Sequence, residues 1–180
     1  RSEDSRYPLS LKDNCLIEIA SKTLLLGCKN SVIPADGSVT AIGDYAFYYC
    51  HELGQIAVPD CVTSIGDYAL SRCRSLKAIE VSENNLHYTS VDGVLFNKDM
   101  STIVRYPRGK EGKQYIIPCK VTTIGVNAFE STPLQEIEIP DGLQTIGTGA
   151  FDCNTSLKDI NIPASVTTIG RNIHMGVTCI

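Results

Sequence analysis

The amino-acid sequence predicts a mainly β fold with short helical turns, a right-handed solenoid in which coils of 22 to 23 residues stack on one another. Two observations predict it. One apolar pattern containing glycine recurs at a nearly constant spacing, and a second pattern with the alternation of a short strand follows most of its copies. Self-similarity at a period of roughly 20 to 50 residues is typical of repeat architectures, whose units stack to share one core.

The first pattern is V-x-x-I-G-x-x-A-F. Its copies begin, in chain order, at Val39, Val62, Val121, Leu143 and Val166. The steps between them are 23, 59, 22 and 23 residues, so only the second step departs from the period. The glycine indicates a backbone position that has positive φ or is too crowded for a Cβ. We expect a one-turn helix after it, which buries the alanine and the phenylalanine.

The second pattern is L-x-x-I-x-I or L-x-x-I-x-V. Its copies begin at Leu53, Leu76, Leu134 and Leu157. The end of the pattern alternates as a strand does, so Ile56 and Val58 point inward while Gln55 and Ala57 point outward. Stacked copies therefore predict a parallel sheet. Proline has no N–H for the sheet ladder and ends three of these strands, at 59, 140 and 163.

Two further segments predict β-hairpins, one at the N-terminus and one inside the long step, near residues 83–117. The predicted hairpin strands are residues 14–18 with 23–25, and residues 93–97 with 102–104. The predicted turns lie at 20–22 and 99–101. We expect the first hairpin to cover the open edge of the first coil, which would otherwise favour aggregation. The inserted hairpin is expected to widen or bend the solenoid.

Together these blocks resemble the BspA-like subgroup of leucine-rich repeats, which includes large surface proteins of host-associated bacteria and some protists. The resemblance covers most of the chain and rests on V-T-x-I-G-x-x-A-F followed by L-x-x-I-x-I-P. It implies a leucine-rich-repeat solenoid from an extracellular or cell-surface protein that serves adhesion or recognition. It implies no catalytic residues.

We expect one leucine-rich-repeat domain over residues 1–180, because neighbouring coils share a core. Its parts are residues 1–38 as N-terminal hairpin and cap, 39–81 as repeats, 82–118 as the hairpin insert, and 119–180 as repeats and C-terminal cap. In the last copy, Ile173 and His174 replace the alanine and phenylalanine. That change indicates either a degenerate terminal cap or a truncation point.

Composition excludes several classes of function. The 180 residues are 43% hydrophobic and 20% charged, as in soluble proteins that bury a core. A net charge of −4 and a pI near 5.3 give no basic surface for nucleic acid. No apolar run approaches the roughly 18 to 20 residues that span a bilayer, so we expect no direct membrane insertion of this segment.

The eight cysteines predict packing rather than chemistry. No two are separated by only two residues, and the histidines show no ligand spacing, so we expect no metal and no cofactor. Cys50, Cys73 and Cys153 occupy what look like equivalent turns, where leucine-rich repeats place asparagine or cysteine, and buried reduced thiols are the preferred interpretation. The alternative is a disulfide in an exported protein, involving Cys15, Cys28, Cys61 or Cys119.

No enzyme is expected either. The segment 109–114 lacks the glycine spacing of a phosphate loop, and the repeated placement of cysteines favours structure over a nucleophile. Neighbouring carboxylates are more common as a solvated acidic face than as a glycosidase pair. The N-glycosylation sequon that begins at Asn154 is a three-residue match and therefore weak evidence.

The outward positions of the second pattern are the candidate ligand-binding residues, because equivalent positions of stacked coils form a ladder. They are Gln55, Ala57, Ala78, Glu80, Glu136, Glu138, Asp159 and Asn161. Their acidic and polar balance favours a protein or glycan ligand with basic or hydrogen-bonding groups, from a host or elsewhere. A face that is merely solvated is the alternative.

The expected function is therefore a non-catalytic interaction or adhesion module of a secreted or cell-surface bacterial protein. A structural spacer in a larger surface protein is the second hypothesis. No concentrated exposed aromatic cluster is evident in the sequence to argue against it. A hydrolase accessory domain comes third, and the oligomeric state is left open.

Overall fold

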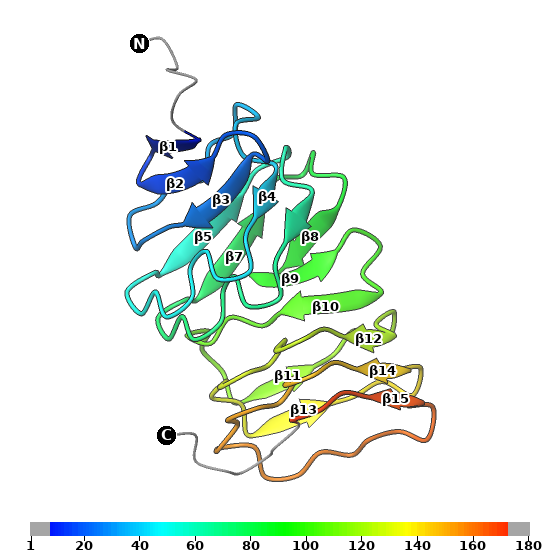
Figure 1. Cartoon of the computed structure of the whole chain (residues 1–180). Helices are drawn as coiled ribbons and strands as arrows, with labels where there is room; N and C mark the ends of the chain where they lie inside the picture. The colour runs from blue at the N-terminus through cyan, green and yellow to red at the C-terminus, as the bar shows by residue number, and fades with distance from the viewer. Residues whose placement is uncertain (1–7, 173–180) are drawn as a thin grey trace.

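The structure is a computed structural model that describes residues 8–172 (Figure 1). These residues form fifteen β-strands and no helix, wound into an elongated stack of coils. The N-terminal strands lie at one end of the stack and the last coils at the other (Figure 1). The predicted solenoid is confirmed, whereas the expected cap residues Ile173 and His174 lie outside the described part.

The first sheet joins the N-terminal hairpin to the first two copies of V-x-x-I-G. Its strands, in spatial order, are β1 (Leu9–Lys12), β2 (Cys15–Glu18), β3 (Thr23–Leu26), β4 (Ala41–Ile42) and β6 (Ser64–Ile65). The first three are antiparallel, and β3, β4 and β6 are parallel. The V-x-x-I-G segments are thus short strands themselves, which the sequence pattern did not predict. The hairpin continues their sheet and so covers the edge of the first coil.

The second sheet repeats this arrangement after the insert. Its strands, in spatial order, are β15 (Thr168–Ile169), β14 (Thr145–Ile146), β12 (Thr123–Ile124), β10 (Thr102–Arg105), β9 (Val94–Asn97) and β8 (Tyr88–Val91). Strands β8, β9 and β10 are antiparallel, and β10, β12, β14 and β15 are parallel. The insert therefore begins a new array of coils instead of bending one continuous sheet.

Both predicted hairpins exist, and each carries one strand more than predicted, β1 or β8. The added strands join their neighbours through two-residue turns, Asp13–Asn14 and Asp92–Gly93, in which both residues have positive φ. Such turns match the twist of an antiparallel pair, and Asp-Gly between two apolar runs is a strong hairpin signal. The sequence thus contained the evidence for β8 at residues 92–93.

Three of the four copies of the second pattern form strands as predicted, but in two separate sheets, and the copy that begins at Leu157 forms only an isolated bridge. Strand β5 (Gln55–Val58) pairs in parallel with β7 (Ala78–Val81), and β11 (Gln114–Ile116) pairs in parallel with β13 (Glu136–Glu138). An isolated bridge then links Glu136 to Asp159. On its other side, β7 meets the insert, because the Ile79 amide donates to the Gly93 carbonyl at 2.9 Å.

The one-turn helices expected after each glycine are absent, and stacked β-turns take their place. The Ala46 amide donates to the Gly43 carbonyl three residues back, but the next amide, of Phe47, donates to Ala69 in the following coil at 2.9 Å. The alternation recurs at 128–129. A helical turn needs such local bonds at consecutive residues. Donation of every second amide to the next coil therefore prevents the helix and joins the coils.

Crowding explains the glycine of V-x-x-I-G. A Cβ on Gly66 would lie 2.4 Å from the Asp44 Cα of the preceding coil, and one on Gly147 would lie 2.7 Å from the carbonyl carbon of Gly125. Neither glycine has positive φ. Of the two predicted reasons, the crowded backbone is therefore correct at these positions.

The apolar residues of both patterns fill the inside of the coils. Their side chains form two buried clusters, one around the first two coils and one around those after the insert. In the second cluster, the rings of Phe129 and Phe151 stack with centroids 5.5 Å apart, and Tyr106 stacks on Phe129 at the same distance. Equivalent positions of successive coils thus pack directly on each other, as a shared solenoid core requires.

Candidate functional site

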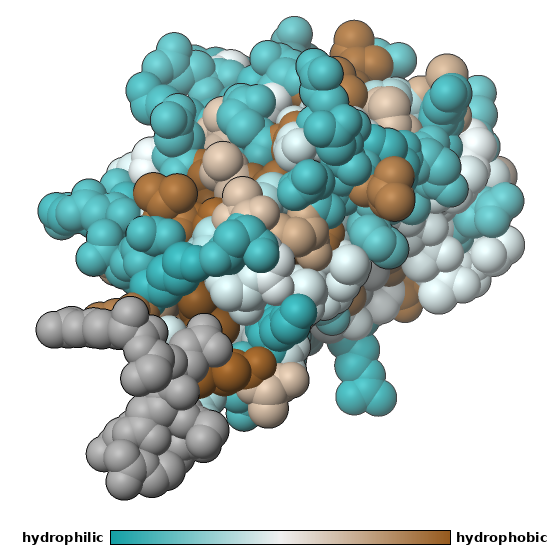
Figure 2. All heavy atoms as spheres, turned by 90° about the horizontal axis from the view of Figure 1, so that it is seen from above, coloured by the Kyte–Doolittle hydropathy of each residue, from teal (hydrophilic) through white to brown (hydrophobic). Residues whose placement is uncertain are grey.

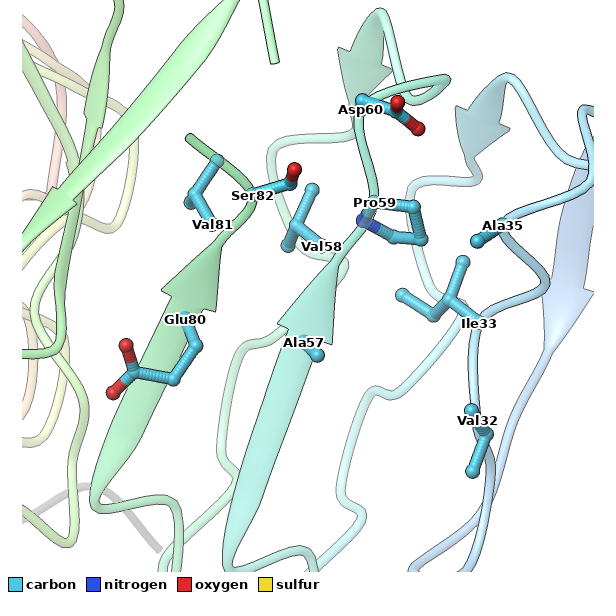
Figure 3. Close-up of a pocket in the computed structure, with 10 residues that line it drawn as sticks. All are labelled: Val32, Ile33, Ala35, Ala57, Val58, Pro59, Asp60, Glu80, Val81 and Ser82. Carbon is cyan, nitrogen blue, oxygen red and sulfur yellow. The ribbon is translucent and has the colours of Figure 1, made fainter. Parts of the chain in front are cut away.

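A groove crosses the carboxyl ends of β5 and β7, beside the segment that precedes the first complete coil (Figure 3). We call it the β5–β7 groove, and its volume is about 580 Å³. Its lining residues are Val32, Ile33, Ala35, Ala57, Val58, Pro59, Asp60, Glu80, Val81 and Ser82. Figure 3 shows the segment 32–35 on one side of the groove and the ends of the two strands on the other.

Hydrogen bonds to the first hairpin hold the segment 31–35 away from β5. The Val32 amide donates to the Asp13 carbonyl at 3.1 Å, and the Ser31 hydroxyl donates to the Asn14 carbonyl at 2.6 Å. Among these described residues, no backbone hydrogen bond joins 31–35 to β5. The stack is therefore open at this point, and the opening is the groove.

The groove has an apolar floor and an acidic rim. Ile33 and Val58 are buried beneath it, whereas the Val32 side chain is 65% exposed. The rim carries the carboxylates of Asp60 and Glu80, both exposed and, within residues 8–172, without an ion-pair partner. An apolar surface with unpaired carboxylates suits a partner that brings an apolar side chain together with a cationic group.

The structure places the eight predicted ligand-binding residues in two groups. Seven are exposed, and Ala78 is half-buried because the Gly93 turn of the insert lies against it. Gln55 and Ala57 lie beside Ala78 and Glu80 on β5 and β7. The other group is Glu136, Glu138, Asp159 and Asn161, on and beyond β13. Only Ala57 and Glu80 line the β5–β7 groove.

The expectation that no exposed aromatic cluster exists is wrong. Tyr45, Tyr48, Tyr49 and Tyr68 form what we call the tyrosine cluster, on the turns that precede β5 and β7. The first three side chains are 58%, 39% and 47% exposed. The signal was present in the run Tyr-Ala-Phe-Tyr-Tyr at 45–49. The repeat buries only its alanine and phenylalanine, which leaves the tyrosines outside.

A buried ion pair, Arg105 with Glu130, lies in the second array of coils where that array meets the first. Arg105, at the end of β10, is 5% exposed and lies 3.8 Å from Glu130, which is 7% exposed. The Arg105 guanidinium also donates to the Asp67 carbonyl at 3.1 Å, to the Ser71 hydroxyl at 2.7 Å and to the Asn127 carbonyl. Burial lowers the pKa of Arg105, and the Glu130 carboxylate opposes that effect. Through these contacts Arg105 connects the coils before the insert to the coils after it, which indicates a structural role.

A family model described as a BspA type leucine rich repeat region matches six copies, over residues 16–107 and 108–180. The chain belongs to the BspA-type leucine-rich-repeat family. Proteins with this repeat are typically surface proteins, and the repeat is generally non-catalytic.

Three solved bacterial structures are similar to this BspA-type chain. A leucine-rich repeat protein from Eubacterium ventriosum is 35% identical over 74% of this chain and 36% of its own, with a TM-score of 0.67. A leucine rich cell surface protein from Faecalibacterium prausnitzii is 30% identical over 78% and 43%, with a TM-score of 0.62. The pneumococcal vaccine antigen PcpA is 26% identical over 78% and 47%, with a TM-score of 0.61.

The chain thus spans less than half the length of each of these structures. A comparison with curated proteins found no match.

One turn position of the BspA-type repeat points into the coil, and it is filled by Cys50, Cys73, Thr132 and Asn154. Cys73 is buried and donates to the Phe47 carbonyl at 3.0 Å, and burial raises the pKa of its thiol to about 11. A thiol with so high a pKa is a poor nucleophile. The predicted packing role is confirmed for Cys73.

Asn154 fills the same inward position in a later coil of the BspA-type array. Its side chain is fully buried, donates to the Phe129 carbonyl at 2.9 Å and accepts from the Thr132 amide and hydroxyl. All of these partners belong to the preceding coil. The sequon at Asn154 is therefore closed to a glycan in the folded protein.

Cys153 corrects the expectation that every thiol is reduced, because it is disulfide-bonded. Among residues 8–172, the free cysteines are Cys15, Cys28, Cys50, Cys61, Cys73 and Cys119, so the expected alternative pairings are not formed. Cys153 is not equivalent to Cys50 and Cys73. It aligns with Tyr49 and Arg72, whose backbones also have positive φ, and Asn154 takes the inward position. The sulfur of Cys153 is therefore not in the inward position of the coil.

Within the described BspA-type coils, no group of three histidine, cysteine, aspartate or glutamate residues could hold a metal ion. No helix there is long and apolar enough to cross a membrane.

Proposed function

We propose that this chain is a non-catalytic recognition module of a larger bacterial surface protein, and that it binds a protein ligand at the β5–β7 groove. The observation that carries the proposal is the open stack beside β5, where an exposed apolar side chain, Val32, borders a groove with an acidic rim. Hot spots of protein interfaces form in such apolar pockets, and the rim steers partners of opposite charge.

Two facts support an extracellular role. Proteins with BspA-type repeats are typically surface proteins. The disulfide at Cys153 fits an oxidising compartment, because cytosolic thiols are kept reduced. A protein ligand is preferred over a glycan at this groove, because the apolar part of the lining is aliphatic and offers no aromatic ring on which a sugar could stack.

The test uses the immobilised chain and a panel of purified extracellular-matrix proteins and oligosaccharides, with affinities measured by surface plasmon resonance. Ala57→Arg fills the groove and Glu80→Lys inverts its rim charge, while both positions are exposed. Glu138→Lys is the matched control, because it makes the same charge change on the exposed strand of the other sheet. All three variants should keep the thermal midpoint of the parent.

We expect a protein ligand whose affinity falls at least about tenfold in Ala57→Arg and is unchanged in Glu138→Lys. If neither groove variant changed the affinity for the ligand, the groove would be excluded as the binding site. The absence of any ligand on the panel would favour a structural spacer, and capture of oligosaccharides alone would favour glycan recognition.

A further inference from the structure

We propose a second binding site: the tyrosine cluster and two neighbouring aspartates bind a cationic peptide segment of a partner protein by placing its arginine or lysine side chains on the tyrosine rings. This site is separate from the β5–β7 groove. The turns that carry the cluster precede β5 and β7, whereas the groove lies where these strands end.

The four rings form one continuous aromatic surface. Tyr45 and Tyr68, one coil apart, stack with ring centroids 5.4 Å apart and planes 15° from parallel. Tyr45 meets Tyr48 edge to face at 5.5 Å, and Tyr48 meets Tyr49 in the same way at 4.8 Å. The rings hold each other in place while staying exposed, so little conformational entropy is lost when a partner covers them.

The cluster already binds one guanidinium group from within the chain. Arg72 lies over the Tyr49 ring, 5.4 Å from its centroid, and donates to the Tyr49 hydroxyl at 2.9 Å. This contact uses Tyr49, and Arg72 also pairs at 3.1 Å with Glu130, whose single charge it shares with Arg105. Tyr45 and Tyr48 present the remaining exposed rings to a second cation.

Two exposed aspartates place negative charge next to these tyrosines along the chain. Asp44 and Asp67 immediately precede Tyr45 and Tyr68, and both are exposed. They stack one coil apart, because the backbone of Gly66 lies directly against Asp44. Within residues 8–172, neither carboxylate forms an ion pair with a lysine or arginine. Two like charges in adjacent coils favour a cation between or above them.

The charge decides the class of partner. Exposed aromatic rings alone would suit a sugar or an apolar side chain as well as a cation. Rings that follow two exposed carboxylates, neither of which forms an ion pair within residues 8–172, instead select positive charge, which neutral sugars do not carry. A flexible segment with several arginine or lysine residues can place one on Tyr45 and another on Tyr48.

The site is tested with a dye-labelled peptide of alternating glycine and arginine, and with its citrulline counterpart, which keeps the shape and loses the charge. Fluorescence anisotropy gives the affinity of the whole chain for each peptide. Ring-labelled tyrosine NMR then locates the contact. We expect the arginine peptide to bind, to shift the Tyr45 and Tyr48 ring signals, and to bind at least about tenfold more tightly than the citrulline peptide.

Replacing both rings, in Tyr45→Leu/Tyr48→Leu, should weaken arginine-peptide binding by about five- to thirty-fold, as expected for two exposed cation–π contacts. Asp44→Asn/Asp67→Asn should weaken it in low salt and leave a smaller difference in high salt. The matched control is Glu136→Gln/Glu138→Gln, which removes two carboxylates from another exposed face and should change the affinity less than twofold.

Circular dichroism checks that each variant is folded, and the aspartate pair tests the site independently if the leucine variant unfolds. Equal binding of the two peptides overturns the proposal. So does an affinity that neither double variant changes, or an oligosaccharide such as maltohexaose that shifts the tyrosine rings while the arginine peptide does not. Ala57→Arg should leave peptide binding unchanged, so failure of the groove proposal and failure of this one are distinguishable.

Discussion

Replacement of Arg105 by methionine should destabilise the protein strongly, because the change removes one of the two cations that face the buried Glu130 carboxylate, the other being Arg72. Glu130 Oε2 accepts no hydrogen bond from the described residues, and Arg105 lies 3.8 Å from it. The carbonyl of Asp67 and the hydroxyl of Ser71 also lose their donor. Methionine keeps most of the volume of the buried stem, so the main loss is electrostatic.

The expected loss is about 3–5 kcal/mol of unfolding free energy, the range found when one partner of a buried ion pair is removed. Glu130 keeps its contact with Arg72 at 3.1 Å, and this remaining contact favours the lower half of the range. A domain is stabilised by only about 5–15 kcal/mol in total. The variant should therefore unfold at a clearly lower denaturant concentration.

Arg105 also links the two arrays of coils, so its loss should change the form of the transition. It contacts Asp67 and Ser71 before the insert and Asn127 and Glu130 after it. The stability of a solenoid is close to a sum of unit and interface terms. With the interface weakened, we expect the single urea transition, followed by far-UV circular dichroism, to broaden or to separate into two.

A double-mutant cycle tests the cause. Glu130→Gln removes the charge that Arg105 neutralises, so Arg105→Met/Glu130→Gln should be more stable than the sum of the two single losses predicts, by about 0.5–3 kcal/mol. Arg74→Met removes an exposed arginine and should change stability by less than about 0.5 kcal/mol. If Arg105→Met costs less than about 1 kcal/mol, or if the two losses simply add, the uncompensated Glu130 carboxylate is not the cause of the destabilisation.

Three further predictions follow from the packing of the coils. Gly66→Ala should cost about 1–3 kcal/mol in urea denaturation, because its Cβ would lie 2.4 Å from the preceding coil, whereas Gly54→Ala, with nothing within 4 Å, should be neutral. Asn154→Ala should cost a similar amount, because it leaves buried groups of the preceding coil unpaired; a loss below about 0.5 kcal/mol would contradict this. Burial raises the pKa of Tyr106 to about 12, so its stabilisation is present below pH 10 and is lost as the pH rises from about 10 to 12. Unfolding free energies across this pH range should fall less steeply in Tyr106→Phe.

Periodicity was sufficient to predict the interior of the fold. The positions of Ile56 and Val58 follow from alternation alone, and both are buried on β5. The short strands on the other side, such as β4, have only two residues and show no alternation that a pattern could reveal. The turns were predicted as helices because the spacing indicates only which residues are buried. The carbonyl to which each backbone amide donates depends on the position of the next coil.

The site residues were predictable only in part. Alternation placed Ala57 and Glu80 on the outward face, and they line the groove. The groove itself exists because Val32 and Ser31 bond to the first hairpin instead of β5, a competition between distant segments that no local pattern records. Arg105 and Glu130, 25 positions apart, likewise have no shared motif that could indicate their contact.

Three features distinguish this chain from a uniform array: the opening beside β5, the buried Arg105 and the exposed tyrosines. Each lies where the repeat pattern is interrupted or where it leaves the residue type unspecified. A regular coil satisfies its backbone by pairing with both neighbours, which leaves neither an opening nor a reason to bury a charge. The opening beside β5 arises where one coil pairs with a hairpin. The buried Arg105 arises at the end of β10, where the Gly-x-x-Ala-Phe turn of the repeat is missing. The tyrosines occupy turn positions that face away from the core, so the repeat does not constrain them. The proposed recognition of a partner therefore depends on residues that the periodic pattern leaves free, because the residues that repeat are the ones used in stacking the coils.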